Sequence, residues 1–138
     1  MATKFLQLQH ADELSGCILT YGHFSTIHPG HIRYLRHART LGKQLAIALI
    51  GDRGSISYPF TQRERAEAVS LLGIADCVLL LEGNEIERVV TQLKPGVLVL
   101  GNEYENKPEI QSTLIQQRNQ GGSVQFHAGD IHYATADL

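Results

Sequence analysis

Residues 16–36 read GCILTYGHFSTIHPGHIRYLR, and this stretch decides the predicted fold. A short apolar run is typical of a buried strand, a turn rich in Gly and His follows it, and an amphipathic helical segment then begins. Pro29 suits the first helical turn, because its missing N–H would have no partner there. His28 and His31 lie three residues apart at this helix start, where unpaired N–H groups and the positive end of the helix dipole attract anions. Two ring donors in that position predict an anion clamp and indicate phosphoryl or nucleotidyl transfer.

The chain has 138 residues, a length that fits a single domain with a sizeable core. Its hydrophobic content of 43% and its formal net charge of −2 are typical of a globular protein. Without a basic excess, general nucleic-acid binding is not expected. No apolar run approaches the roughly 20 residues that span a bilayer, so no membrane partner is expected. Cys17 and Cys77 lie in apolar, strand-like runs, which predicts buried thiols in a reducing compartment and a cytoplasmic location.

Apolar spacing predicts strands and helices in alternation along the chain. The strands are expected over residues 17–21, 44–50, 75–81, 97–100 and 123–127. The helices are expected over residues 4–14, 29–41, 61–72, 84–93 and 108–120. This alternation implies right-handed βαβ crossovers, and therefore an α/β fold with a doubly wound, mostly parallel, five-stranded sheet. Ligands of such sheets bind at the carboxyl ends of the strands, where the loops over 22–31, 51–60, 101–106 and 128–135 are expected to converge.

Residues 21–31, YGHFSTIHPGH, resemble the signature of the cytidylyltransferase-like nucleotidyltransferases, which carry an HxGH motif. The family includes glycerol-3-phosphate cytidylyltransferases and the adenylyltransferase domain that activates heptose 1-phosphate in lipopolysaccharide synthesis. The resemblance covers nearly the whole chain, through Asp52 after the second strand, RER at residues 63–65 and KPGVLVLG at residues 94–101. It implies a single Rossmann-like nucleotidyltransferase domain over residues 1–138. Some relatives are fused to sugar kinases, which suggests that this domain is the N-terminal part of a longer protein.

The resemblance implies a reaction in which a phosphate oxygen of an acceptor attacks the α-phosphorus of a nucleoside triphosphate and releases pyrophosphate. Positioning and charge neutralisation supply most of the catalysis in such reactions. His28 and His31 would donate hydrogen bonds to the triphosphate and stabilise the pentavalent transition state. Mg²⁺ would balance the remaining charge, with ATP or CTP as the nucleotide. The implied acceptor is a small phosphorylated molecule, a sugar phosphate in preference to glycerol phosphate or choline phosphate, and a homodimer is expected because related domains commonly dimerise.

The remaining site residues come from this match and from the helix starts. The residues expected to bind the nucleotide are Tyr21, Gly22, His23, Phe24, Ser25, Gly30, Arg63, Gly101, Asn102, Glu103 and Thr135. Arg63 and Arg65 lie at a helix start, where a cation is unfavourable to the dipole, so one of them is expected to face phosphate. Arg65 is assigned a catalytic role. Asp52 and Arg53 are assigned to the acceptor, although Asp52 also suits the cap of a turn. No protein ligand for a metal is assigned.

Three departures from the family pattern leave alternatives open. Ser25 stands where many relatives carry Asp, residues 53–62 contain no Lys for the triphosphate, and Thr135 alone represents a Ser/Thr-rich signature. A nucleotide-binding module that regulates without turnover is therefore an alternative, and a flavodoxin-like interaction domain fits the strand–helix alternation alone. His28 and His31 also have the spacing of a zinc-binding pair, although no Cys, Asp or Glu lies near them in the sequence.

Overall fold

The structure, a computed structural model, describes residues 3–52 and 59–128. Its strands are β1 (Lys4–Gln7), β2 (Ile18–Gly22), β3 (Leu45–Leu49), β4 (Cys77–Leu80), β5 (Val97–Gly101) and β6 (Ser123–His127). Its helices are α1 (Pro29–Arg39), α2 (Gln62–Ser70), α3 (Ile86–Leu93) and α4 (Pro108–Asn119), and its short 3₁₀ turns are η1 (Leu8–His10), η2 (Asp12–Leu14) and η3 (Asn102–Tyr104). None of these described helices is both long and apolar enough to cross a membrane.

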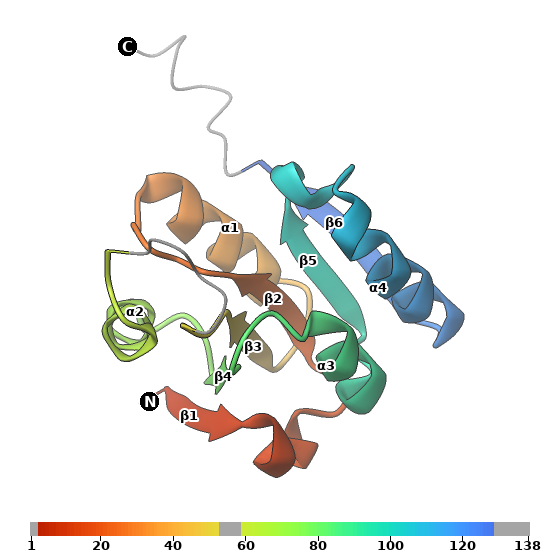
Figure 1. Cartoon of the computed structure of the whole chain (residues 1–138), viewed down its shortest axis with the longest axis horizontal. Helices are drawn as coiled ribbons and strands as arrows, with labels where there is room; N and C mark the ends of the chain where they lie inside the picture. The colour runs from red at the N-terminus through yellow and green to blue at the C-terminus, as the bar shows by residue number, and fades with distance from the viewer. Residues whose placement is uncertain (1–2, 53–58, 129–138) are drawn as a thin grey trace, which may run out of the picture.

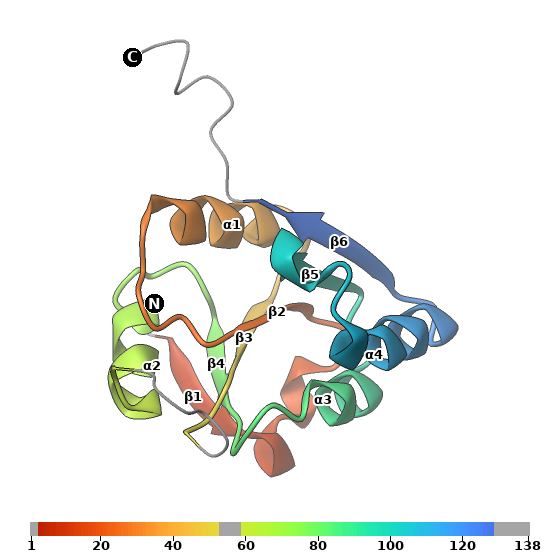
Figure 2. The same cartoon turned by 45° about the horizontal axis from the view of Figure 1, so that its top comes forward.

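The strands form one six-stranded parallel sheet in the order β1-β4-β3-β2-β5-β6. Helices α1 and α2 cover one face and α3 and α4 cover the other (Figures 1 and 2), so the predicted doubly wound α/β fold is confirmed. The direction of winding changes between β2 and β5, because the chain moves outward from β2 to β3 and β4 and then returns to the other side of β2. Pairing between β2 and β5 ends at Thr20 and Val99, although the strands continue to Gly22 and Gly101. The last two residues of each strand are therefore not paired with the other strand. A crevice at this switch point is where ligands bind in open α/β sheets.

The predictions of five strands and of a helix over residues 4–14 are wrong. Residues Lys4–Gln7 form the edge strand β1, which pairs with β4, and the Lys4 N–H donates to the Asp76 carbonyl at 3.0 Å. Four residues are too few to distinguish a strand period from a helical one. The strand forms because β4 presents a free edge, and that partner lies far away in the sequence, where a local pattern cannot reveal it.

The central strands are buried on both faces, which explains their nearly continuous apolar sequences. Leu19 packs in the core beneath α3 and α4, whereas its neighbour Ile18 packs in the core beneath α1 and α2. Cys17 and Cys77 are buried, as predicted, and burial raises the pKa of their thiols to about 12 and about 11. Both cysteines are therefore unreactive thiols at neutral pH.

The loop after β3 is held close to the loop after β4 at the carboxyl edge of the sheet. The Gly51 N–H donates to the Gly83 carbonyl at 2.9 Å, and a Cβ on Gly51 would overlap the carbonyl oxygen of Glu82. Only glycine permits this approach. Asp52, the next residue, is consequently held near the end of β2, where the Ile50 N–H donates to the Gly22 carbonyl at 3.0 Å.

Candidate active site

The amino end of α1 is capped by two imidazoles. His28 is the N-cap residue, and its Nδ1 accepts a hydrogen bond from the Gly30 N–H at 3.0 Å. His31 reaches back, and its Nδ1 accepts from the His28 N–H at 3.2 Å. Pro29 occupies the first helical position, as predicted. The histidines thus take the two places that a Ser or Thr and a Glu fill in an ordinary capping box.

These caps fix the tautomer of both rings. A backbone N–H only donates, so the Nδ1 atom of each ring is an acceptor without a proton, and the ring proton is on Nε2. Burial lowers the pKa of His31, and the neighbouring charge of His28 lowers it further, so His31 is neutral at neutral pH. The ring centroids lie 4.1 Å apart. The helix start therefore carries two adjacent Nε2–H donors held in place by the main chain.

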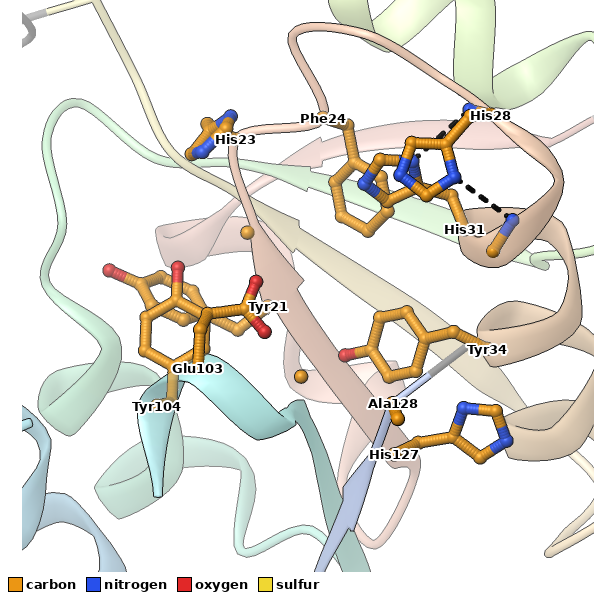
Figure 3. A pocket seen from close by; sticks show the side chains of 13 residues that line it. Tyr21, His23, Phe24, His28, His31, Tyr34, Glu103, Tyr104, His127 and Ala128 are labelled. Carbon is orange, nitrogen blue, oxygen red and sulfur yellow. Dashed lines mark hydrogen bonds between the residues drawn. The ribbon is translucent and has the colours of Figure 1, made fainter. Parts of the chain in front are cut away.

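The two rings form one wall of a cleft of about 140 Å³ at the switch point. Figure 3 shows His28, His31 and Phe24 together on one side of the cleft, with Tyr21, Glu103 and Tyr104 across from Tyr34. The cleft is lined by the end of β2 and the turn after it, the first turns of α1, the end of β5 with η3, and the end of β6. Its lining residues are Tyr21, Gly22, His23, Phe24, His28, Gly30, His31, Tyr34, Gly101, Glu103, Tyr104, His127 and Ala128. Its place at the switch point and its imidazole, phenol and carboxylate side chains suit a small polar ligand.

Phe24 anchors the turn between β2 and α1. Its side chain is buried, with its ring centroid 5.4 Å from that of His31 and 6.4 Å from that of Tyr34. Its backbone adopts a φ of 51°, in the left-handed region that residues other than glycine rarely occupy. Such conformations persist where the surroundings enforce them, commonly at functional sites. Burial of the Phe24 ring thus holds the turn in a shape that brings its main chain to the cleft.

Tyr34 forms the inner side of the cleft, and sequence reasoning did not assign it to the site. Its hydroxyl donates to the Val99 carbonyl at 2.5 Å, and burial raises the pKa of the phenol, so the group remains a neutral donor. The available signal was its spacing, because a residue three positions after His31 shares its helical face. Tyr104 and His127 line the same cleft. The Tyr104 ring packs against Tyr21 at 5.6 Å between centroids.

The predicted nucleotide residues are only partly brought together. Seven of them line the cleft beside the two motif histidines: Tyr21, Gly22, His23, Phe24, Gly30, Gly101 and Glu103. Ser25 contacts the His23 ring, at 2.6 Å between Oγ and Nδ1, and is not itself in the lining. Arg63 and Asn102 are exposed and also lie outside the lining. Arg53 and Thr135 fall outside the described residues.

Arg65, which the sequence assigns a catalytic role, is buried among acceptors of the protein itself. Its side chain is 1% exposed, with Nη1 donating to the carbonyls of His23 at 2.7 Å and Ile50 at 2.8 Å. Its Nε donates to the Phe60 carbonyl at 3.2 Å, and its Nη2 pairs with the Asp52 carboxylate at 3.1 Å. The guanidinium therefore ties the turn after β2 to the loop after β3.

Asp52 has the position of a turn cap, the second possibility that its sequence context allowed. Its Oδ1 accepts from the Gln62 N–H at 2.9 Å as well as from Arg65. Helix α2 then begins with a capping box, in which Thr61 accepts from the Glu64 N–H and Glu64 accepts from the Thr61 N–H. The start of α2 is thus organised around Arg65 and its partners.

The zinc possibility for His28 and His31 requires a further ligand beside them. Within residues 3–52 and 59–128, no group of three His, Cys, Asp or Glu side chains is arranged to hold a metal ion. The Nδ1 atoms of both rings are also occupied by backbone N–H groups. The described arrangement favours donation to an anion over metal ligation.

Comparison with known proteins places this cleft in a recognised enzyme family. The cytidylyltransferase-like family model matches residues 19–130. Two relatives, each named bifunctional protein HldE, come from Campylobacter concisus and Pseudomonas syringae; they are 32% and 34% identical over 72% and 78% of this chain. The chain spans about a quarter of their length, 22% and 23%.

Solved structures agree with the sequence matches. The lipopolysaccharide core biosynthesis protein of Thermoplasma volcanium is 26% identical, with a TM-score of 0.61 over 78% of this chain and 90% of that one. Pantothenate synthetase of Thermus thermophilus, at 11% identity and a TM-score of 0.58 over 90% of this chain and 60% of that one, shares the fold. The family model covers most of the chain, and the predicted enzyme class, a nucleotidyltransferase, is confirmed with the family. This chain belongs to the cytidylyltransferase-like family.

Proposed function

We propose that this domain transfers AMP or CMP from a nucleoside triphosphate to a small phosphorylated acceptor and releases pyrophosphate. The proposal rests on the pair His28 and His31. Both rings cap the helix with Nδ1, which leaves two adjacent Nε2–H donors at the cleft. Donors fixed by the main chain suit phosphate oxygens, because they need no reorganisation when charge develops. Family membership supports the same class of reaction.

The proposed reaction is an in-line displacement at the α-phosphorus. A bond forms between an acceptor phosphate oxygen and the α-phosphorus, while the bond to the oxygen that bridges to the β-phosphorus breaks and its electron pair leaves with pyrophosphate. His28 and His31 donate to phosphate oxygens as negative charge accumulates on them, and both rings keep their protons throughout. Gly30 is buried beside them, where any larger side chain would reduce the room for the nucleotide.

The nucleotide is proposed to occupy the cleft between the turn after β2 and η3. Tyr21, Gly22, His23, Phe24, Ser25, Gly101, Asn102 and Glu103 are proposed to contact it, together with Arg63 and Thr135. Mg²⁺ bound to the triphosphate would supply further charge neutralisation. The described lining fits this ion, because Mg²⁺ commonly takes one or two carboxylates with substrate phosphates and water, and Glu103 provides such a carboxylate.

A sugar phosphate is the proposed acceptor. Its support is the similarity to proteins named HldE and to a lipopolysaccharide core biosynthesis protein. Asp52 and Arg53, in the loop after β3, are proposed to lie near the acceptor. We further propose that residues 1–138 act as one domain of a longer cytoplasmic protein and that the domain is a homodimer.

A nucleotide-binding module without turnover is the second candidate, and one observation favours it. The described residues that line the cleft include neither Lys nor Arg, because Arg65 is directed toward backbone carbonyls. Phosphoryl-transfer sites usually place such a cation on the phosphates. Acceptor-dependent release of pyrophosphate would reject this candidate, and tight nucleotide binding without turnover would support it.

A thermal-shift screen tests the proposed nucleotide site. ATP, CTP, GTP and UTP with Mg²⁺ are added in turn to the wild type, to His31→Ala and to His10→Ala, whose exposed histidine lies on η1 away from the cleft. A ligand at about 100 times its Kd should raise the free energy of unfolding by about 2.7 kcal/mol. We expect a shift with one triphosphate in the wild type and in His10→Ala, and a weaker shift in His31→Ala. Equal shifts in all three proteins would remove His31 from the site.

A further inference from the structure

Tyr34 lies at the point where the pairing between β2 and β5 ends. Its hydroxyl donates to the Val99 carbonyl at 2.5 Å, and Val99 and Thr20 form the last register pair that the two strands share. Beyond this pair, residues 21–22 and 100–101 form a fork beside the cleft. The Tyr34 side chain is 6% exposed and packs in the core beneath α1 and α2, where a hydroxyl is costly to bury unless it is hydrogen-bonded. The hydroxyl is therefore tolerated in this apolar core because it has partners at the fork.

The same hydroxyl also meets the main chain of β2. The Ile18 N–H donates to the Gln44 carbonyl, immediately before β3, and successive N–H groups of a strand alternate between its two neighbours. The Tyr21 N–H, three residues further on, therefore points toward β5. Burial raises the pKa of the Tyr34 phenol, and a hydrogen bond from the Tyr21 main chain lowers it, as a donor to the phenol oxygen does. The hydroxyl thus accepts a hydrogen bond from β2 and donates one to β5.

The Tyr34 ring links this fork to the first turn of α1. It stacks on Phe24 with an angle of 9° between the ring planes, and the Phe24 ring in turn packs against His31. Figure 3 shows the Tyr34 ring extending from α1, with its hydroxyl directed away from that helix. Tyr34 follows His31 by three residues on the same face of one helix. A bond that fixes the Tyr34 hydroxyl therefore also fixes the position of the two motif histidines over the sheet.

We propose that Tyr34 is a positioning residue of this site, whose hydroxyl bridges the main chains of β2 and β5, holds the fork open and sets the place of the first turn of α1. A hydroxyl that bonds to both strands prevents them from pairing further, toward Gly22 and Gly101, which would narrow the cleft. The hydroxyl itself takes no part in making or breaking bonds. The inference rests on the proposed function for its effect on turnover, whereas the bridge is a property of the fold.

Amide hydrogen exchange measured by NMR tests the bridge. Tyr34→Phe removes the hydroxyl and keeps the ring that stacks on Phe24. After correction for global stability with the slowest amides of β3, we expect the Tyr21 N–H to exchange about tenfold faster in Tyr34→Phe, the effect of one lost hydrogen bond. Thr113→Val is the matched control, because it removes a buried hydroxyl from α4 on the other face of the sheet. 4-Aminophenylalanine at position 34 both donates and accepts, so it should restore the exchange rate of the wild type.

Steady-state release of pyrophosphate tests the consequence for turnover. At a temperature at which every variant is folded, we expect Tyr34→Phe to lower kcat about tenfold or more, because a small displacement of catalytic donors is costly in the transition state. KM for the nucleotide should change less than kcat, since ground-state binding depends less on that placement. Thr113→Val should keep both parameters, and 4-aminophenylalanine at position 34 should recover most of kcat.

Two results would overturn the inference. The first is a corrected exchange rate of the Tyr21 N–H in Tyr34→Phe that equals the rate in Thr113→Val, because the hydroxyl then holds nothing at β2. The second is faster exchange at Tyr21 with the kcat of the wild type, because Tyr34 then supports the fold without positioning the site. If the wild type releases no pyrophosphate with any acceptor, the proposed function fails, and the exchange rates alone then decide whether the hydroxyl holds the fork.

Discussion

Replacing His31 with alanine is expected to lower kcat for nucleotidyl transfer by about 10²- to 10³-fold, the usual effect of removing one preorganised donor to developing negative charge. The ring is fixed with Nδ1 on the His28 N–H and Nε2–H toward the cleft, so no neighbouring group replaces that donor at the same place. KM for the nucleotide should change less than kcat, because the contact strengthens in the transition state. Steady-state release of pyrophosphate measures both parameters.

The same substitution also removes one half of the helix cap. We expect the free energy of unfolding to fall by only about 1 kcal/mol, the usual contribution of a capping side chain. Chemical denaturation therefore separates the two effects, with His10→Ala as the control for a histidine outside the cleft. A kcat within a few-fold of the wild type in a folded His31→Ala protein would contradict the proposed role of the imidazole pair.

Replacing Arg65 with methionine is expected to lower the free energy of unfolding by about 3 kcal/mol, since a buried acceptor left without its donor costs about 1–3 kcal/mol. The carbonyls of His23, Ile50 and Phe60 all lose a donor, and the bond to Ile50 is the buried one. The Asp52 carboxylate contributes less, because its side chain is 58% exposed and water replaces the ion pair.

Arg118→Met is the matched control, because Arg118 is exposed near the end of α4. Its substitution should change the free energy of unfolding by less than about 0.5 kcal/mol. The free energy of unfolding of Arg65→Lys should lie between those of Arg65→Met and Arg118→Met, since an ammonium keeps the charge but cannot reproduce the planar guanidinium. Denaturant midpoints measure the series. If Arg65→Met is as stable as the control but loses nucleotide binding outright, Arg65 contacts phosphate, as the sequence suggested, and the description of it as a support of the turn is wrong.

The turn and helix over residues 21–36 were predictable because their chemistry is local. Pro29 fixes the first helical position, and His28 and His31 satisfy the helix end with their own rings, so the short pattern contains the whole cap. The continuous apolar run over residues 45–49 likewise identifies a strand covered on both faces. The position of the cleft then follows from parallel topology, because loops that follow parallel strands meet at one edge.

The errors arose where long-range contacts decide the outcome. Lys4–Gln7 is a strand only because β4 lies beside it, and Tyr34 reaches the cleft only because α1 packs over β5. The sequence pattern assigned Arg65 a role at phosphate from its place at a helix start, and it could not show that the guanidinium also donates to the carbonyls of His23 and Ile50, which lie far away in the sequence. A cation near a helix start does not show, from sequence alone, whether it faces the ligand or the protein.

The most direct test of the account follows the α-phosphate. The wild type and His31→Ala are incubated with Mg²⁺ and ATP or CTP labelled at the α-phosphorus, with a panel of sugar phosphates as acceptors. The account predicts that label is transferred to one acceptor with release of an equal amount of pyrophosphate, and that both products fall together in His31→Ala. Tight nucleotide binding with no labelled product from any acceptor, or release of labelled nucleoside monophosphate whether or not an acceptor is present, would contradict it.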